Sequence, residues 1–167
     1  MGKFILAGAA SALALAIAAC GSGDEGAENA QNQTAAGENV NAAIADASNP
    51  FAQSEMQMNE RMMAAVGADV GDNWARKMIE HHQGAIDMSE ILLEQNPRAE
   101  VADLARMTIE KQRKGIEDIR KLLKDGGQDR RSAELYRPAM TDMHQKMMAA
   151  RGADVSETFM RKMVEHH

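Results

Sequence analysis

The chain after residue 48 is predicted to be helical, because its apolar residues recur at steps of three and four. No stretch of this region alternates apolar and polar residues for long. The pattern predicts helices over about 50–65, 73–95, 98–124 and 133–150, and another that begins after Ser156. Short connections between long helices favour antiparallel neighbours, so the expected fold is an all-α, up-and-down helical bundle.

The ends of these helices carry recognisable signals. Pro50 stands early in the first helix, Asp72 is the predicted N-cap of the second, and Pro97 ends it. Pro138 near the start of the fourth helix predicts an irregular first turn. The third helix has the clearest apolar stripe, made of Val101, Leu104, Ala105, Thr108, Ile109, Gln112, Ile116, Ile119 and Leu123.

One block of sequence occurs twice. Met58–His82 returns as Met143–His167 at a constant offset of 85 residues, and 15 of the 25 positions are identical. The repeat therefore divides the chain after residue 48 into a first helical unit over 49–125 and a second, truncated unit over 132–167. Because the second copy stops at its histidine pair, we expect the sequence to be a fragment of a longer chain.

The amino terminus has the pattern of a lipoprotein signal peptide over residues 1–20. Lys3 precedes the apolar run Phe4–Ala19, and Ile17–Cys20 fits a cleavage box that ends in a cysteine. The alternative is a short transmembrane anchor, but the run is short for a membrane span. We expect lipid on Cys20, a flexible linker over 21–48, and a periplasm-facing lipoprotein of the cell envelope, anchored in the outer membrane.

Composition excludes several classes of function. A formal net charge of −6 argues against nucleic-acid binding. No nucleophile–base pair, phosphate-binding loop or nucleotide fingerprint occurs, so an enzyme is not expected. Cys20 is the single cysteine, and its sulfur is expected to carry lipid. Soft metal ligands would then have to come from the 14 methionines, although a methionine-rich core is the default interpretation of such residues.

Histidine and methionine lie together in both copies of the repeat. Met78 lies within one helical turn of both His81 and His82, and Met88 shares a face with His81 two turns further on. The preceding helix adds Met62 and Met63. The candidates in the second copy are His144, Met147, Met163, His166 and His167. This second group is predicted to be a half-site, because it has no equivalent of Met88.

Imidazole with thioether is a ligand set for copper, as Cu(I) and, through the histidines, as Cu(II). Zinc prefers histidine, cysteine and carboxylate, and bundle-type di-iron sites use a Glu-x-x-His motif, which the sequence lacks. Glu80 and Asp87 are either partners that orient imidazoles or solvated side chains. Gln112 either bonds a site histidine or lies at the edge of the bundle. Both alternatives stay open at this stage.

The run from Met78 to Met88, with Leu104, Ala105, Ile109 and Gln112 after it, resembles the bacterial family known as domain of unknown function 305 (DUF305). The resemblance covers about 51–123, and the second copy from about Met140 looks like the start of another unit. It implies a ferritin-like bundle in an exported protein. Some members bind copper through histidine and methionine, which implies copper at Met78, His81, His82 and Met88.

This chain departs from the family pattern at two places. Glu80 and Glu165 stand where members commonly have proline, and Gly115–Ile119 lacks a methionine that members often carry. We expect a copper-binding lipoprotein that buffers copper, confers tolerance or passes the metal to a partner protein, as a monomer or a homo-oligomer. The competing classes are a structural or interaction lipoprotein without metal and, less favoured, a metal redox enzyme.

Overall fold

A computed structural model describes residues 49–167, and every regular element in this range is helical. The elements are α2 (Ala52–Ala64), α3 (Val70–Glu94), α4 (Ala99–Arg120), α5 (Arg130–Ala133), the 3-10 turn η1 (Glu134–Tyr136), α6 (Arg137–Ala149) and α7 (Val155–His166). The predicted signal peptide, lipidated Cys20 and linker over 21–48 lie outside the described residues. No described helix has the length and apolar character that crossing a membrane requires.

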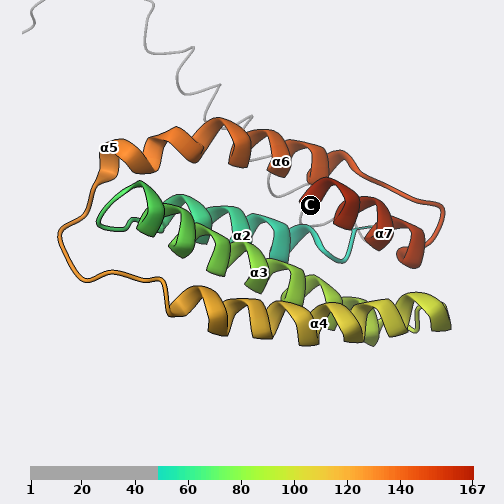
Figure 1. The fold of residues 1–167 in the computed structure, drawn as a ribbon. Helices are drawn as coiled ribbons and strands as arrows, with labels where there is room; N and C mark the ends of the chain where they lie inside the picture. Colours follow the sequence, from blue (N-terminus) through green and yellow to red (C-terminus); the bar gives the residue numbers. More distant parts are fainter. Residues whose placement is uncertain (1–48) are drawn as a thin grey trace, which may run out of the picture. The chain divides into compact units, whose positions relative to one another are not determined.

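The described helices form a bundle in which α3 is central (Figure 1). It packs along α4 on one side and against α2 on another, and α6 then lies against α2. Helix α7 folds back from α6 and also contacts α3. The all-α helical bundle predicted from the apolar stripes is therefore confirmed.

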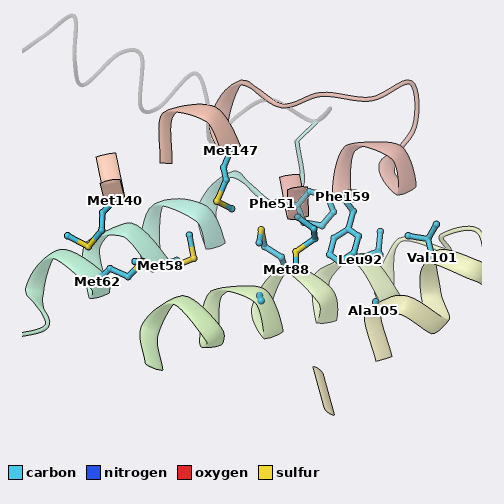
Figure 2. Packing of buried hydrophobic residues seen from close by; sticks show 12 residues of the cluster. Phe51, Met58, Met62, Met88, Leu92, Val101, Ala105, Met140, Met147 and Phe159 are labelled. Atoms are coloured by element: carbon cyan, nitrogen blue, oxygen red, sulfur yellow. The ribbon is translucent and has the colours of Figure 1, made fainter. Parts of the chain in front are cut away.

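The core is rich in methionine and joins residues from both copies of the repeat (Figure 2). Phe51 and Phe159 are fully buried with their ring centroids 5.9 Å apart, so the residue that precedes α2 packs against α7. The buried cluster contains Phe51, Met58, Met62, Ala85, Met88, Leu92, Val101, Ala105, Met140, Met147, Phe159 and Met163.

The N-cap predicted for the second long helix was wrong by one turn. Asp69 is the cap, and its side chain accepts from the Asp72 backbone N–H at 2.9 Å. Asp72 is instead fully buried, and its carboxylate accepts from the backbone N–H groups of Ala68 at 2.7 Å and Lys124 at 3.0 Å. Asp72 thus fastens the chain beyond α4 to α3, and α4 ends at Arg120, earlier than the predicted end near Lys124.

The last helix begins at Val155, and Asp154 is its N-cap. Ser156, predicted to precede this helix, is buried inside it, and its hydroxyl accepts from the Arg98 backbone N–H at 3.0 Å. The irregular start predicted from Pro138 is the turn η1, which leads directly into α6.

Corresponding positions of the two copies make corresponding contacts. Lys77 Nζ donates to the Met62 carbonyl at 2.8 Å, and Lys162 Nζ donates to the Met147 carbonyl at 2.7 Å. The caps Asp69 and Asp154 also correspond. The copies therefore share a local structure in which a lysine of the second helix binds the carboxyl end of the first.

Candidate metal site

The two histidine pairs meet where α3 and α7 contact each other. His81 Nε2 lies 2.8 Å from the His166 carbonyl oxygen, and His166 Nε2 lies 3.1 Å from the His81 carbonyl oxygen. The ring centroids are 3.7 Å apart. A carbonyl oxygen only accepts, so each ring must donate from Nε2 and carry its lone pair on Nδ1. The same residue of each copy thus binds the other, as a two-fold relation between the copies would produce.

Burial keeps these imidazoles neutral. It lowers the pKa of His81 to about 4 and that of His166 to about 3, and the neighbouring histidines add to both shifts. Burial also lowers the pKa of His82. The Nδ1 atoms of His81 and His166 are buried without a hydrogen-bond partner. Each ring therefore keeps a free lone pair in the state that metal coordination needs.

A pocket of about 500 Å³ adjoins this contact. It gathers side chains from α2, α3, α4, η1, α6 and α7, and its donors are chiefly imidazoles and thioethers. The lining residues are Met62, Trp74, Lys77, Met78, His81, His82, Gln112, Tyr136, Ala139, Met140, Met143, His166 and His167. The side chains of this lining include neither a carboxylate nor a thiol.

The polar groups around the pocket are held in place by the main chain. Lys77 Nζ donates to the Met62 and Ala65 carbonyls at 2.8 and 2.9 Å, and burial lowers the pKa of this lysine. The Tyr136 hydroxyl donates to the Val70 carbonyl at 2.9 Å. Trp74 lies partly in solvent, with 43% of its surface exposed. Trp74 thus brings an aromatic ring to the solvent-exposed part of the lining, while His81 and His166 of the same lining are buried.

Helix α4 closes the pocket beside His82. A Cβ atom at Gly115 would come within 2.7 Å of His82 Cδ2 and 2.9 Å of its Nε2, so glycine makes room for the ring. Gln112, one turn earlier on α4, lines the pocket. It forms no hydrogen bond to a histidine there, so the first of its two predicted roles is not seen.

The structure brings together only part of the predicted ligand set. Met62, Met78, His81, His82, His166 and His167 line the one pocket, so the expectation of a separate half-site in the second copy was wrong. Sequence alone does not show that α7 returns to α3, and this return unites the two pairs.

The other predicted residues lie elsewhere. Met88, Met147 and Met163 are buried in the hydrophobic core and do not line the pocket. Met63 Sδ accepts from Arg137 Nη1 at 3.7 Å outside the pocket. His144 lies on α6, where the charges of Glu55 and Lys162 act on its pKa, which burial lowers.

The acidic residues beside the first histidine pair do not orient imidazoles. Glu80 and Asp87 both pair with Arg61, at 3.1 and 2.8 Å, so this predicted alternative was wrong.

Sequence reasoning missed Met140, Met143, Tyr136 and Trp74 as pocket residues. A signal for Trp74 was present, since it lies four residues before Met78 and therefore on the same helix face. Met143 corresponds to Met58 in the repeat. Because Met58 is a core residue, the repeat alone gave no reason to assign Met143 to a site.

Among the described residues, no three side chains drawn from histidine, cysteine, aspartate and glutamate form a metal-binding group. A metal held in this pocket would thus draw on thioethers as well as imidazoles.

The family model described as "Domain of unknown function (DUF305)" matches residues 24–123 and 73–167. Together these two overlapping matches cover most of the chain, so the chain belongs to this family. Comparisons with curated proteins and with solved structures gave no match.

Proposed function

We propose that this DUF305 protein is a copper-binding lipoprotein of the cell envelope, which buffers copper or passes it to a partner protein. The observation that carries the proposal is the single pocket that gathers four histidines and four methionines from distant parts of the chain. Imidazole and thioether together are typical ligands of copper, whereas zinc sites seldom include thioether.

The residues present fit copper on two counts. The buried Nδ1 atoms of His81 and His166 have no hydrogen-bond partner, and the low pKa values of both rings leave them unprotonated at neutral pH. The thioethers of Met62 and Met78 line the same pocket and need no deprotonation. Bound copper would supply a redox-active centre, but storage and transfer require only its binding and release.

The location of the protein rests on the sequence. The positive start, the apolar run and the box ending in Cys20 support export and lipidation, which would anchor the mature chain in the outer membrane facing the periplasm. Labelling cells with a fatty-acid probe tests this, because a Cys20→Ser chain should lose the label.

Copper titration tests the binding. The mature full-length chain is titrated with Cu(I) under reducing conditions against a chromogenic chelator. We expect His82→Ala with His167→Ala to weaken binding by at least about tenfold, which corresponds to about 1.4 kcal/mol. These two residues line the pocket without the mutual carbonyl bonds of His81 and His166. His144→Ala, outside the pocket, is the matched control and should bind like the parent chain.

A structural role without metal is the second candidate. It is favoured by the contact between His81 and His166, whose hydrogen bonds to main-chain carbonyls already explain why two histidines lie there. A parent chain that binds no Cu(I) in the titration would support this role and would exclude copper binding.

A further inference from the structure

We propose that the pocket holds a single soft monovalent cation between the two copies of the repeat, and that Met140 and Met143 of α6 are among its ligands. This inference rests on the proposed copper function. It adds ligands that the family resemblance does not name, a stoichiometry of one, and a preference for monovalent over divalent ions.

The two copies of the repeat differ in how they pack around this contact. The reciprocal contact of His81 with His166 relates α3 to α7 and α2 to α6, so each side of this contact has a counterpart on the other. On one side of this contact, Met58 and Phe51 are fully buried in the core. On the other side the same repeat positions are Met143 and Tyr136, which line the pocket.

One amino-acid difference between the copies changes the chemistry of the two sides. Lys162 pairs with the carboxylate of Glu55 at 2.7 Å, and both side chains are fully buried. At the related positions stand Lys77 and Met140, which line the pocket together. A thioether therefore stands beside the lysine where the other side has a carboxylate. The duplication provides two related places, of which one is packed core and one is an open pocket.

The charge of this pocket sets the kind of ion that it accepts. Its donors are neutral, and the charged group that lines it, Lys77, is a cation held by the Met62 and Ala65 carbonyls. The side chains that line the pocket therefore offer a bound ion no anionic ligand. The cost of burying an ion rises with the square of its charge, so a divalent ion is disfavoured roughly fourfold more than a monovalent one.

Softness selects further among monovalent ions. Thioether sulfur binds Cu(I) and its redox-inert analogue Ag(I), whereas sodium and potassium prefer oxygen. We therefore expect Cu(I) and Ag(I) to bind and Zn(II) to bind weakly.

The chain contains its own reporter of occupancy. Trp74 is the only tryptophan in the sequence, and it lines this pocket one turn before Met78. An ion bound beside Met78 should change its fluorescence, so binding in this pocket can be told apart from binding at the chain surface.

The experiment follows tryptophan fluorescence of the mature full-length chain, together with metal bound at equilibrium, during titration with Ag(I), Cu(I) and Zn(II). We expect a fluorescence change that saturates at a single equivalent of Ag(I) or Cu(I), and none with Zn(II) at the same concentrations. Met140→Leu with Met143→Leu should weaken both soft ions by at least about tenfold. Leucine nearly conserves the volume of methionine, and circular dichroism confirms that the variant is folded.

Met107→Leu with Met160→Leu is the matched control, because both methionines are exposed and neither lines the pocket. The inference is overturned if two equivalents bind, if Zn(II) competes equally, or if the α6 variant keeps the parent affinity. Any of these results with firm Cu(I) binding leaves the proposed function intact. A parent chain that binds no Cu(I) removes both.

Discussion

The buried ion pair between Glu55 and Lys162 tests how the two repeat copies are held together. Lys162 Nζ lies 2.7 Å from Glu55 Oε1 and donates to the Met147 carbonyl, and both charged side chains are fully buried. Removing one partner of such a pair costs about 3–5 kcal/mol, because the remaining charge has neither water nor a counter-charge. Glu55 would keep the Asn49 amide at 3.4 Å, which does not neutralise it. We therefore expect Lys162→Met to lower the free energy of unfolding by about 3–5 kcal/mol.

The repeat provides a matched control at the corresponding position. Lys77 is also buried, and it donates to two main-chain carbonyls. Lys162, in contrast, pairs with a carboxylate in addition to a main-chain carbonyl. Lys77→Met loses hydrogen bonds without stranding a buried anion, so a smaller loss of about 1–3 kcal/mol is expected. Combining Glu55→Gln with Lys162→Met removes both charges and should recover at least half of the loss caused by Lys162→Met alone.

The measurement is urea unfolding of the mature full-length chain, followed by far-UV circular dichroism. A loss of 3–5 kcal/mol is a large share of the roughly 5–15 kcal/mol by which folded domains are stable, so the shift in midpoint should be plain. The reasoning is refuted if Lys162→Met costs no more than Lys77→Met. It is refuted equally if the double variant is as unstable as Lys162→Met.

Three further predictions concern the histidines and the amino terminus. Because the pKa values of His81 and His166 are lowered in the folded chain, the unfolded chain, with a histidine pKa of 6.5, takes up protons first as the pH falls. The stability that these two histidines contribute is therefore fully present above pH 6.5 and is lost as the pH drops toward 4. When the pH is lowered from about 6.5 to about 5, protonation linked to His81 alone should reduce the free energy of unfolding by roughly 2 kcal/mol. Urea unfolding measures this reduction, and an unchanged midpoint would contradict it. Gly115→Ala should displace the His82 ring and weaken Cu(I) binding by roughly tenfold while the helix content is kept, and parent-like affinity would show that the ring position is immaterial. Cys20→Ser should leave the chain in the soluble fraction after cell lysis, and continued membrane association would exclude lipid anchoring through this residue.

The sequence predicted the helices well because burial repeats with the helical period. In α4, Val101, Ala105, Ile116 and Ile119 of the predicted stripe are buried. The N-cap was placed wrongly because two aspartates stand three residues apart and either could cap a helix. Local sequence does not reveal that the second of them is required inside the fold.

The site was harder to predict for two physical reasons. The first is that a methionine serves equally as core filler or ligand, and only packing decides: Met78 lines the pocket while Met88, on the same helix, is fully buried. The second is that the pocket depends on α7 returning to α3. Each helix face could be predicted from its own periodicity, but a contact between residues as distant as His81 and His166 depends on how the whole bundle packs.

Comparing the two repeat copies distinguishes residues that hold the helices together from residues that would serve as metal ligands. His81 and His166 are the same in both copies, and the fold explains this, because each ring bonds the main chain of the other. Loss of copper after replacing either one would therefore not prove ligation, since α7 would lose its hold on α3 as well. Met140 differs from its counterpart Glu55, and it is at such differing positions that one side of the contact became a pocket. The decisive evidence for a metal ligand must come from these positions, where a side chain of equal volume removes a sulfur and leaves the helix contact in place.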